Sequence, residues 1–197
     1  MHFPNAITAP VLIAFATLAV FLAGCSDPPS HTAGVAVRPT GGDFMLQSAA
    51  GPVDTRALRG KVLLVYFGYT HCPDVCPAAM GVGAQTLNAL TPEERAKTRM
   101  LMISVDPERD TPDVLKTYVA YFHPEMVGVT GTPAEIAAVA KAYGAAYVRQ
   151  PPNEHGAYAV DHSAQTFVVA PDGRLAEILQ PSAPKEKMLA VVRGLLP

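Results

Sequence analysis

The chain contains 197 residues, of which 49% are hydrophobic and 16% are charged, and its formal net charge is −2. A composition this apolar can bury the core of one domain, which excludes a globally disordered protein. Charges of both signs are spread along the chain and do not form the clustered basic face that nucleic-acid binding needs. We therefore expect no nucleic-acid partner.

An uninterrupted apolar run, VLIAFATLAVFLA, occupies residues 11–23 near the N-terminus. The run is shorter than the about 20 residues that span a bilayer, and its length is typical of the apolar part of an export signal. It leads into LAGC at residues 22–25, which resembles the lipobox of bacterial lipoproteins and predicts lipidation of Cys25. A plain signal peptide followed by a chance cysteine is the alternative interpretation.

These N-terminal features predict three parts of the chain. Residues 1–24 would be a lipoprotein signal peptide, and residues 25–41, which are rich in Pro, Gly, Ser and Thr, would be a flexible tether. Residues 42–197 would form the folded domain. We accordingly expect a lipid-anchored protein of the bacterial cell envelope that faces the periplasm.

The first half of the predicted domain alternates between strand and helix patterns. Residues 61–69, KVLLVYFGY, form a nearly continuous apolar run that is typical of a central strand buried on both faces. Residues 77–90 place apolar side chains at helical intervals, and a capping box at Thr91 begins the next helix. The same reasoning predicts a short hairpin within residues 44–53, strands at 99–105 and 127–129, and helices that start at Thr111 and Thr132, the second ending at Gly144.

The C-terminal part changes to antiparallel patterns. Residues 165–170 and 175–180 flank a Pro-Asp-Gly turn that closes a hairpin, and residues 184–196 are typical of a closing helix. Strand–helix alternation followed by a hairpin and a helix predicts an α/β fold, a mixed central sheet with helices on both faces. Two closely spaced cysteines within such a pattern indicate a thioredoxin-like fold.

Cys72 and Cys76 follow the predicted central strand and precede the predicted helix. Because the N-terminus of that helix favours negative charge, we expect lowered thiol pKa values and thiolates near neutral pH. Thiolates are nucleophiles and also ligands of soft metal ions, so redox chemistry and metal binding both stay open. A purely structural disulfide is the weaker interpretation, because closing so short a loop stabilises the fold little.

A metal bound by two thiolates would need a third ligand, which one of the six histidines could supply. His162 is favoured, because in a thioredoxin-like sheet the segment entering the predicted strand at 165–170 lies beside the redox loop. A surface histidine is the alternative. Asp161 would either orient the imidazole, as carboxylates near ligating histidines do, or only form a turn before the strand.

Three segments together resemble the Sco/SenC family. They are YFGYTHCPDVCP at residues 66–77, SVDPERDTP at 104–112 and VDHSAQTFVVAPDG at 160–173, and the resemblance extends from about residue 42 to 196. It implies a thioredoxin fold that binds one copper ion, Cu(I) or Cu(II), through Cys72, Cys76 and His162. It also implies a role in assembling the binuclear copper centre of cytochrome c oxidase.

The resemblance leaves two functions to compare. The first is a metallochaperone, not an enzyme, whose partner is the copper-bearing oxidase subunit and which also meets other periplasmic copper chaperones and thiol reductases. The second is a thiol–disulfide oxidoreductase that reduces the cysteines of that subunit, or a redox or copper sensor. In either case the acidic loop Asp106, Glu108, Arg109 and Asp110 would contact the partner or serve only as turn and helix-capping residues.

Overall fold

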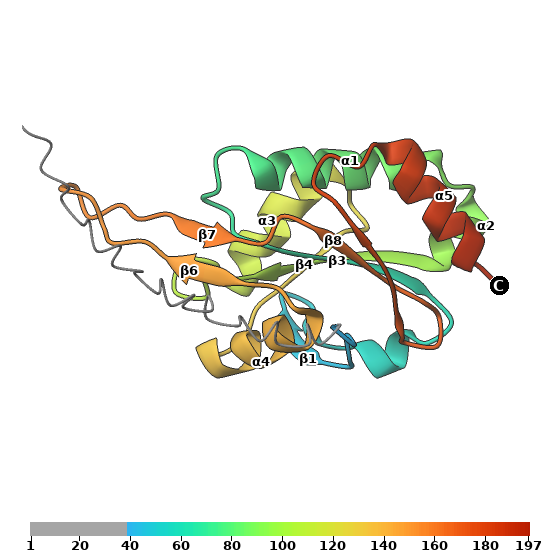
Figure 1. Ribbon diagram of the computed structural model, residues 1–197, viewed down its shortest axis with the longest axis horizontal. Coiled ribbons are helices and arrows are strands. Elements are labelled where there is room, and N and C mark those ends of the chain that lie inside the picture. Colours follow the sequence, from blue (N-terminus) through green and yellow to red (C-terminus); the bar gives the residue numbers. More distant parts are fainter. Residues whose placement is uncertain (1–38) are drawn as a thin grey trace, which may run out of the picture. The chain divides into compact units, whose positions relative to one another are not determined.

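The computed structural model describes residues 39–197, so the predicted signal peptide, Cys25 and most of the predicted tether lie outside the described residues. A five-stranded sheet in the order β5-β4-β3-β8-β9 forms the centre of the domain (Figure 1). Its β3, β4 and β5 strands are parallel, whereas β8 runs antiparallel to β3 and β9 antiparallel to β8. The strands are β3 (Val62–Gly68), β4 (Thr98–Ser104), β5 (Val127–Val129), β8 (Thr166–Val169) and β9 (Leu175–Leu179).

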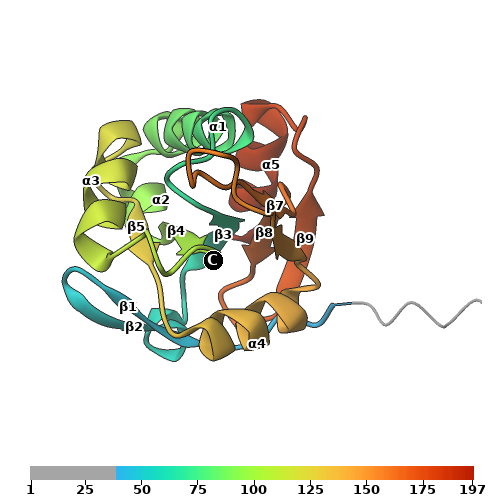
Figure 2. The same ribbon diagram turned by 90° about the vertical axis from the view of Figure 1, so that its left-hand side faces the viewer.

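Helices cover both faces of the sheet, as predicted. Three of them, α1 (Val75–Ala89), α3 (Pro112–Phe122) and α5 (Lys185–Leu195), lie on one side, and α4 (Pro133–Tyr143) lies on the other (Figure 2). The short α2 (Pro92–Ala96) starts at the expected capping box. This arrangement confirms the thioredoxin-like α/β fold. No helix within residues 39–197 has the length and apolar character needed to cross a membrane.

The central strand β3 is buried along its whole length, because β4 and β8 pair with its two edges and helices cover both faces of the sheet (Figure 2). Its apolar run therefore meets side chains from both faces of the sheet. On the α4 side, the ring of Tyr143 packs against Phe67 and Phe167, with ring centroids 5.9 Å and 5.7 Å away. This aromatic cluster joins α4 to the middle of the sheet.

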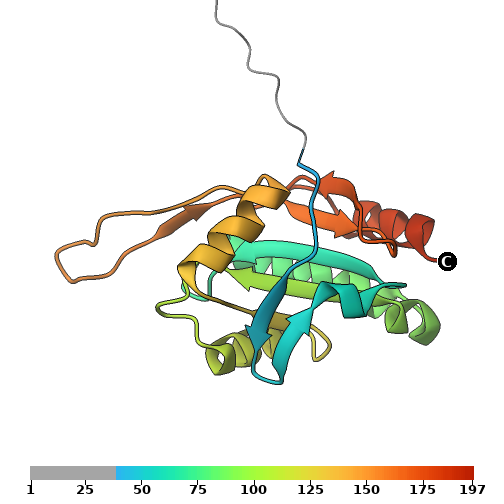
Figure 3. The ribbon, with the colours of Figure 1, turned by 90° about the horizontal axis from the view of Figure 1, so that it is seen from below.

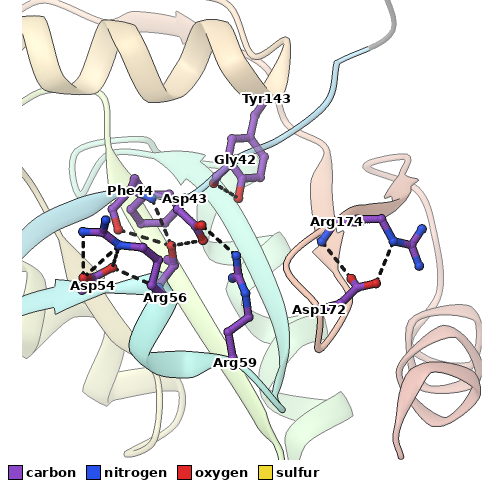
Figure 4. A network of polar contacts seen from close by, with 10 residues as sticks. Gly42, Asp43, Phe44, Asp54, Arg56, Arg59, Tyr143, Asp172 and Arg174 are labelled. Atoms are coloured by element: carbon purple, nitrogen blue, oxygen red, sulfur yellow. Dashed lines mark hydrogen bonds and ion pairs between the residues drawn. The ribbon is translucent and has the colours of Figure 1, made fainter.

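The N-terminal hairpin consists of β1 (Met45–Ser48) and β2 (Gly51–Asp54), followed by a 3-10 turn at Thr55–Leu58. Polar contacts fasten the chain entering it (Figure 4): Asp43 pairs with Arg59 at 2.7 Å, and the Tyr143 hydroxyl donates to the Gly42 carbonyl at 3.1 Å. Gly41 is also buried and donates to the Ala142 carbonyl. The packed domain therefore includes Gly41, which the predicted boundary at residue 42 had left in the tether.

A two-stranded arm is the main feature that the sequence did not predict. Strands β6 (Tyr147–Arg149) and β7 (Val160–His162) pair antiparallel and project beyond the central sheet (Figure 3). Each strand has only three residues, which is too short for an alternating pattern to be recognised. The arm matters because His162, expected in the segment that enters the strand at 165–170, is the last residue of β7 and pairs with Tyr147.

We expect Tyr143→Ala to lower the free energy of unfolding of the domain by about 3–5 kcal/mol, because it empties a fully buried position between two sheet aromatics. The matched control is Tyr121→Ala on α3, whose side chain is 86% exposed and which should change the stability by less than about 0.5 kcal/mol. Urea unfolding followed by circular dichroism measures both. Equal losses in the two variants would contradict the proposed role of the aromatic cluster.

Candidate metal centre

The two cysteines lie at the end of β3, as the sequence predicted. Cys72 is in the loop that leaves the strand, and Cys76 is the second residue of α1. Cys76 is fully buried and Cys72 is 9% exposed, and the thiols are not bonded to each other. Both sulfurs therefore lie below the surface, where few polar groups compete with a metal for them.

His162 reaches this position from the arm, 86 residues further along the chain. Its Nε2 atom lies 3.3 Å from Cys76 Sγ, and its Nδ1 atom lies 3.1 Å from the carbonyl oxygen of Ser163. Because a carbonyl can only accept, we assign the imidazole proton to Nδ1. The lone pair of Nε2 then faces the cysteines, which is the tautomer a metal ligand requires.

Asp161 does not orient the imidazole, so this prediction was wrong. The Asp161 carboxylate accepts a hydrogen bond from the side-chain amide of Gln150 at 2.6 Å, across the arm. The reason is strand geometry: neighbouring residues of β7 point to opposite sides, so Asp161 faces away when His162 faces the cysteines. The backbone carbonyl of Ser163 takes the place that was predicted for the carboxylate.

Ligand atoms of Cys72, Cys76 and His162 all lie within 4.8 Å of one another. A metal bonded at about 2.0–2.3 Å to three such atoms would hold them roughly 3.5–4 Å apart, so only small side-chain shifts separate this arrangement from a filled site. Two sulfurs and one imidazole nitrogen form a donor set for soft or borderline ions such as Cu(I) and Zn(II). The geometry therefore fits one metal ion of this kind.

Burial raises the pKa of the Cys76 thiol to about 12, although a backbone hydrogen bond from Tyr69 acts in the opposite direction. The lowered pKa expected from the helix N-terminus is therefore wrong for this cysteine, because the loss of hydration outweighs the helix dipole. Near neutral pH the Cys76 thiol keeps its proton, and a metal must displace that proton to bind.

Two residues that contact Cys76 were not predicted from the sequence. The Tyr66 hydroxyl lies 3.8 Å from Cys76 Sγ, and burial raises the pKa of this phenol, so it stays protonated and can donate to the sulfur. Gly68 leaves room for the same thiol, since a Cβ atom there would lie 2.7 Å from Cys76 Sγ. Both belong to the quoted run YFGY, but neither showed in the sequence that it would face the sulfur.

The other histidines of the described domain do not join the two cysteines. His71 is exposed and its Nδ1 atom contacts the Thr70 hydroxyl at 3.1 Å. His123 is buried at the end of α3, where its Nδ1 atom accepts from the backbone of Glu125. His155 lies exposed in the loop of the arm. The ligand choice made from the sequence thus stays with His162.

The acidic loop after β4 supports the segment that carries Cys72. Asp110 is fully buried, and its carboxylate accepts from the Thr70 backbone at 3.0 Å, from the Thr70 hydroxyl at 2.6 Å and from Ser104 at 2.7 Å. The cap of α3 is the next residue, Thr111. Asp110 therefore holds the segment that leads into Cys72.

Comparisons with known proteins agree with this geometry. The model of the SCO1/SenC family matches residues 33–197. The chain belongs to the SCO1/SenC family. The SCO2 homolog of mitochondria from Bos taurus is 38% identical over 154 residues, which are 77% of this chain and 58% of that protein. The chain spans only about half to three fifths of the length of several such relatives.

Two solved structures of the Sco family resemble the domain. The structure of Bradyrhizobium japonicum ScoI with copper bound is 38% identical, has a TM-score of 0.72, and covers 79% of this chain and 99% of its own. BsSco, a member of the family of cytochrome c oxidase assembly proteins in which a disulfide switch was identified, is 25% identical with a TM-score of 0.64. That comparison covers 81% of this chain and 95% of BsSco.

We expect Gly68→Ala to lower the free energy of unfolding by about 1–3 kcal/mol, because the new methyl group would overlap the Cys76 sulfur and the Tyr66 ring. Gly81→Ala is the matched control: it lies within α1 with no atom close to the added Cβ, and alanine favours a helix by about 1 kcal/mol. Thermal unfolding of the reduced protein compares them. A Gly68→Ala variant as stable as the wild type would contradict the close packing of this thiol.

Proposed function

We propose that this Sco-family protein binds one copper ion through Cys72, Cys76 and His162 and delivers it to the binuclear copper centre of cytochrome c oxidase. The observation that carries the proposal is the convergence of two sulfurs and one unprotonated imidazole nitrogen within 4.8 Å. Support comes from the related ScoI, whose solved structure holds copper. The oxidase as target rests on the description of BsSco as an oxidase assembly protein.

Three ligands suit a site that must give its ion away. A Cu(I) ion held by two thiolates and one imidazole can accept a further ligand, so thiolates of an acceptor can add before the original ligands leave. Such an exchange moves no electrons. As Cys76 is released it takes up a proton, because burial raises its thiol pKa to about 12, and this protonation opposes rebinding of the ion.

Thiol–disulfide exchange is the second candidate, and the disulfide switch of BsSco favours it. Its attacking group would be a thiolate, and if that group were Cys76 the thiol would first have to lose its proton, because burial raises its pKa to about 12. Oxidation of the two thiols to a disulfide would instead remove both sulfur ligands together. In our proposal such a disulfide regulates copper binding and is not part of a catalytic cycle.

The place of the protein in the cell is also a proposal. The lipobox-like sequence ending at Cys25 and the tether that follows it support a lipid-anchored protein on the periplasmic side of a bacterial membrane. An acceptor subunit that exposes its copper site on the same side would be within reach of the tethered domain.

We expect residues 26–197, reduced and titrated without oxygen against a chelator that competes for Cu(I), to bind one copper ion. Cys72→Ser, Cys76→Ser and His162→Ala should each weaken binding by at least about 100-fold, because each removes one of three ligands. His155→Ala is the matched control, since this exposed histidine of the arm loop lies outside the site and should leave affinity unchanged.

The outcome separates the two candidate functions. Loss of binding in the three ligand variants only would support the copper site. The chaperone function would be contradicted by a wild-type domain that cannot compete with the chelator for Cu(I). If that domain and its His162→Ala variant both reduce a disulfide peptide with turnover, the oxidoreductase becomes the favoured function.

We expect the apparent Cu(I) affinity to rise with pH by about one power of ten per pH unit between pH 6 and 8, from Cys76 alone. The sign follows from the raised pKa: the thiol is protonated throughout this window, so each bound ion releases its proton, and acid favours the metal-free form. Proton release can be measured by calorimetry in buffers of different ionisation enthalpy. Binding that releases no proton would be inconsistent with a protonated Cys76.

A further inference from the structure

A stack of one tyrosine and two arginines lies where β6 and β7 lead into the loop of the arm. The guanidinium carbon of Arg109 is 3.6 Å from the centroid of the Tyr158 ring, and that of Arg149 is 3.7 Å from the same centroid. Two planar groups cannot both lie this close to one face, so the ring is held between them. Each arginine also pairs with a carboxylate, Arg109 with Asp106 and Arg149 with Glu108. The stack is thus neutral overall and tolerates partial burial.

Arg109 also binds the main chain of the arm. Its Nη1 atom donates to the Tyr158 carbonyl at 3.1 Å, and its Nε atom donates to Asp106. The Tyr158 hydroxyl also donates a hydrogen bond to the Asp106 carboxylate, at 2.8 Å. Asp106 is nearly completely buried and its side chain therefore has few other positions. These bonds fix the arm four residues before His162.

A second route leads from Arg109 to the imidazole through Tyr69. The guanidinium lies 5.6 Å from the Tyr69 ring centroid, and the Tyr69 hydroxyl accepts from the backbone of Val160 at 3.2 Å. The Tyr69 ring in turn packs edge-on against the His162 ring, with centroids 5.7 Å apart. Arg109 therefore supports both the strand that carries His162 and the ring that packs against its imidazole.

The short loop between β4 and α3 consequently joins the two halves of the ligand set. Asp110 at its end holds Thr70, two residues before Cys72, and Asp106 with Arg109 holds Tyr158 in the arm. The loop itself is tied together, since the backbone of Asp110 donates to the Asp106 carbonyl at 3.0 Å. A rigid connection of this kind keeps the imidazole and the sulfurs at a defined separation.

We propose that Arg109 is a positioning residue that sets the place of the His162 imidazole relative to the Cys72 and Cys76 sulfurs. Without it the arm would keep its β6–β7 pairing and its Tyr158–Asp106 and Arg149–Glu108 contacts. It would lose the guanidinium that bonds the Tyr158 carbonyl and packs against the Tyr69 and Tyr158 rings. The imidazole would then sample positions too far from the sulfurs for all three ligands to bind one ion. This proposal rests on the copper site proposed above, because its main readout is Cu(I) affinity. Its second readout, the chemical shifts of the His162 ring, needs no metal.

The test is a double-mutant cycle between Arg109→Ala and His162→Ala, measured as Cu(I) affinity by chelator competition. Arg109→Ala alone should weaken binding by about tenfold or more, in the range found for residues that orient metal ligands. In the His162→Ala background it should change affinity by less than about twofold, because there is no imidazole left to position. An equal loss in both backgrounds, or no loss in the wild-type background, would overturn the proposal.

Matched variants separate positioning from charge and from general stability. Arg174→Ala removes an arginine that pairs with Asp172 in the turn between β8 and β9 and should leave copper affinity unchanged (Figure 4). Arg109→Lys keeps the charge but not the planar fork, so its affinity should fall between those of the wild type and Arg109→Ala. A lysine variant that binds as tightly as the wild type would overturn the proposal by assigning the effect to charge.

The second readout is the nitrogen chemical shifts of the His162 ring in the reduced, metal-free protein. Arg109→Ala should move both shifts toward those of a freely exchanging imidazole, whereas Arg174→Ala should not. Unchanged shifts would overturn the proposal even if copper binding failed for other reasons. If Arg109→Ala does not fold, the same measurements are made on Arg109→Lys, because it keeps the charge but loses the planar fork that bonds Asp106 and the Tyr158 carbonyl.

Discussion

The approach of the His162 imidazole to the buried Cys76 sulfur, at 3.3 Å, is the interaction on which the site depends. One partner lies in the first turn of α1 and the other on an arm that projects from the sheet. Nothing local to either segment brings them together. The contact exists because β3 places the cysteine loop at its end, while Tyr69 and the loop after β4 hold the arm against that end.

Burial of the sulfurs decides how this site can be used. A thiol whose pKa is raised to about 12 is a poor nucleophile near neutral pH, but it becomes a strong ligand once a metal has displaced its proton. The same property favours release, since the vacated thiol is protonated again. Two buried sulfurs beside one histidine nitrogen therefore suit reversible metal binding.

The acidic loop has a structural part in this arrangement that neither of its predicted roles described. It was expected to contact a partner or to supply turns and a helix cap. Thr111 caps α3, while Asp106, Arg109 and Asp110 fasten the segments that carry the ligands. The residues of the acidic loop thus have a role within the domain, which is to maintain the separation between His162 and the cysteines. Glu108, which pairs with Arg149, is the most exposed residue of this loop.

The sequence by itself determined the order of the elements outside the arm, the fold class and the candidate residues of the metal centre, because these follow from local periodicity, capping residues or short motifs. Only the tertiary structure decided the existence of the arm, the hydrogen-bond partner of Asp161, the raised pKa of Cys76 and the contacts that Arg109 makes with the arm. Strands of three residues carry no readable period, and a pKa depends on burial by segments far apart in the chain. Distances between residues 86 positions apart are set by packing, which no local pattern contains.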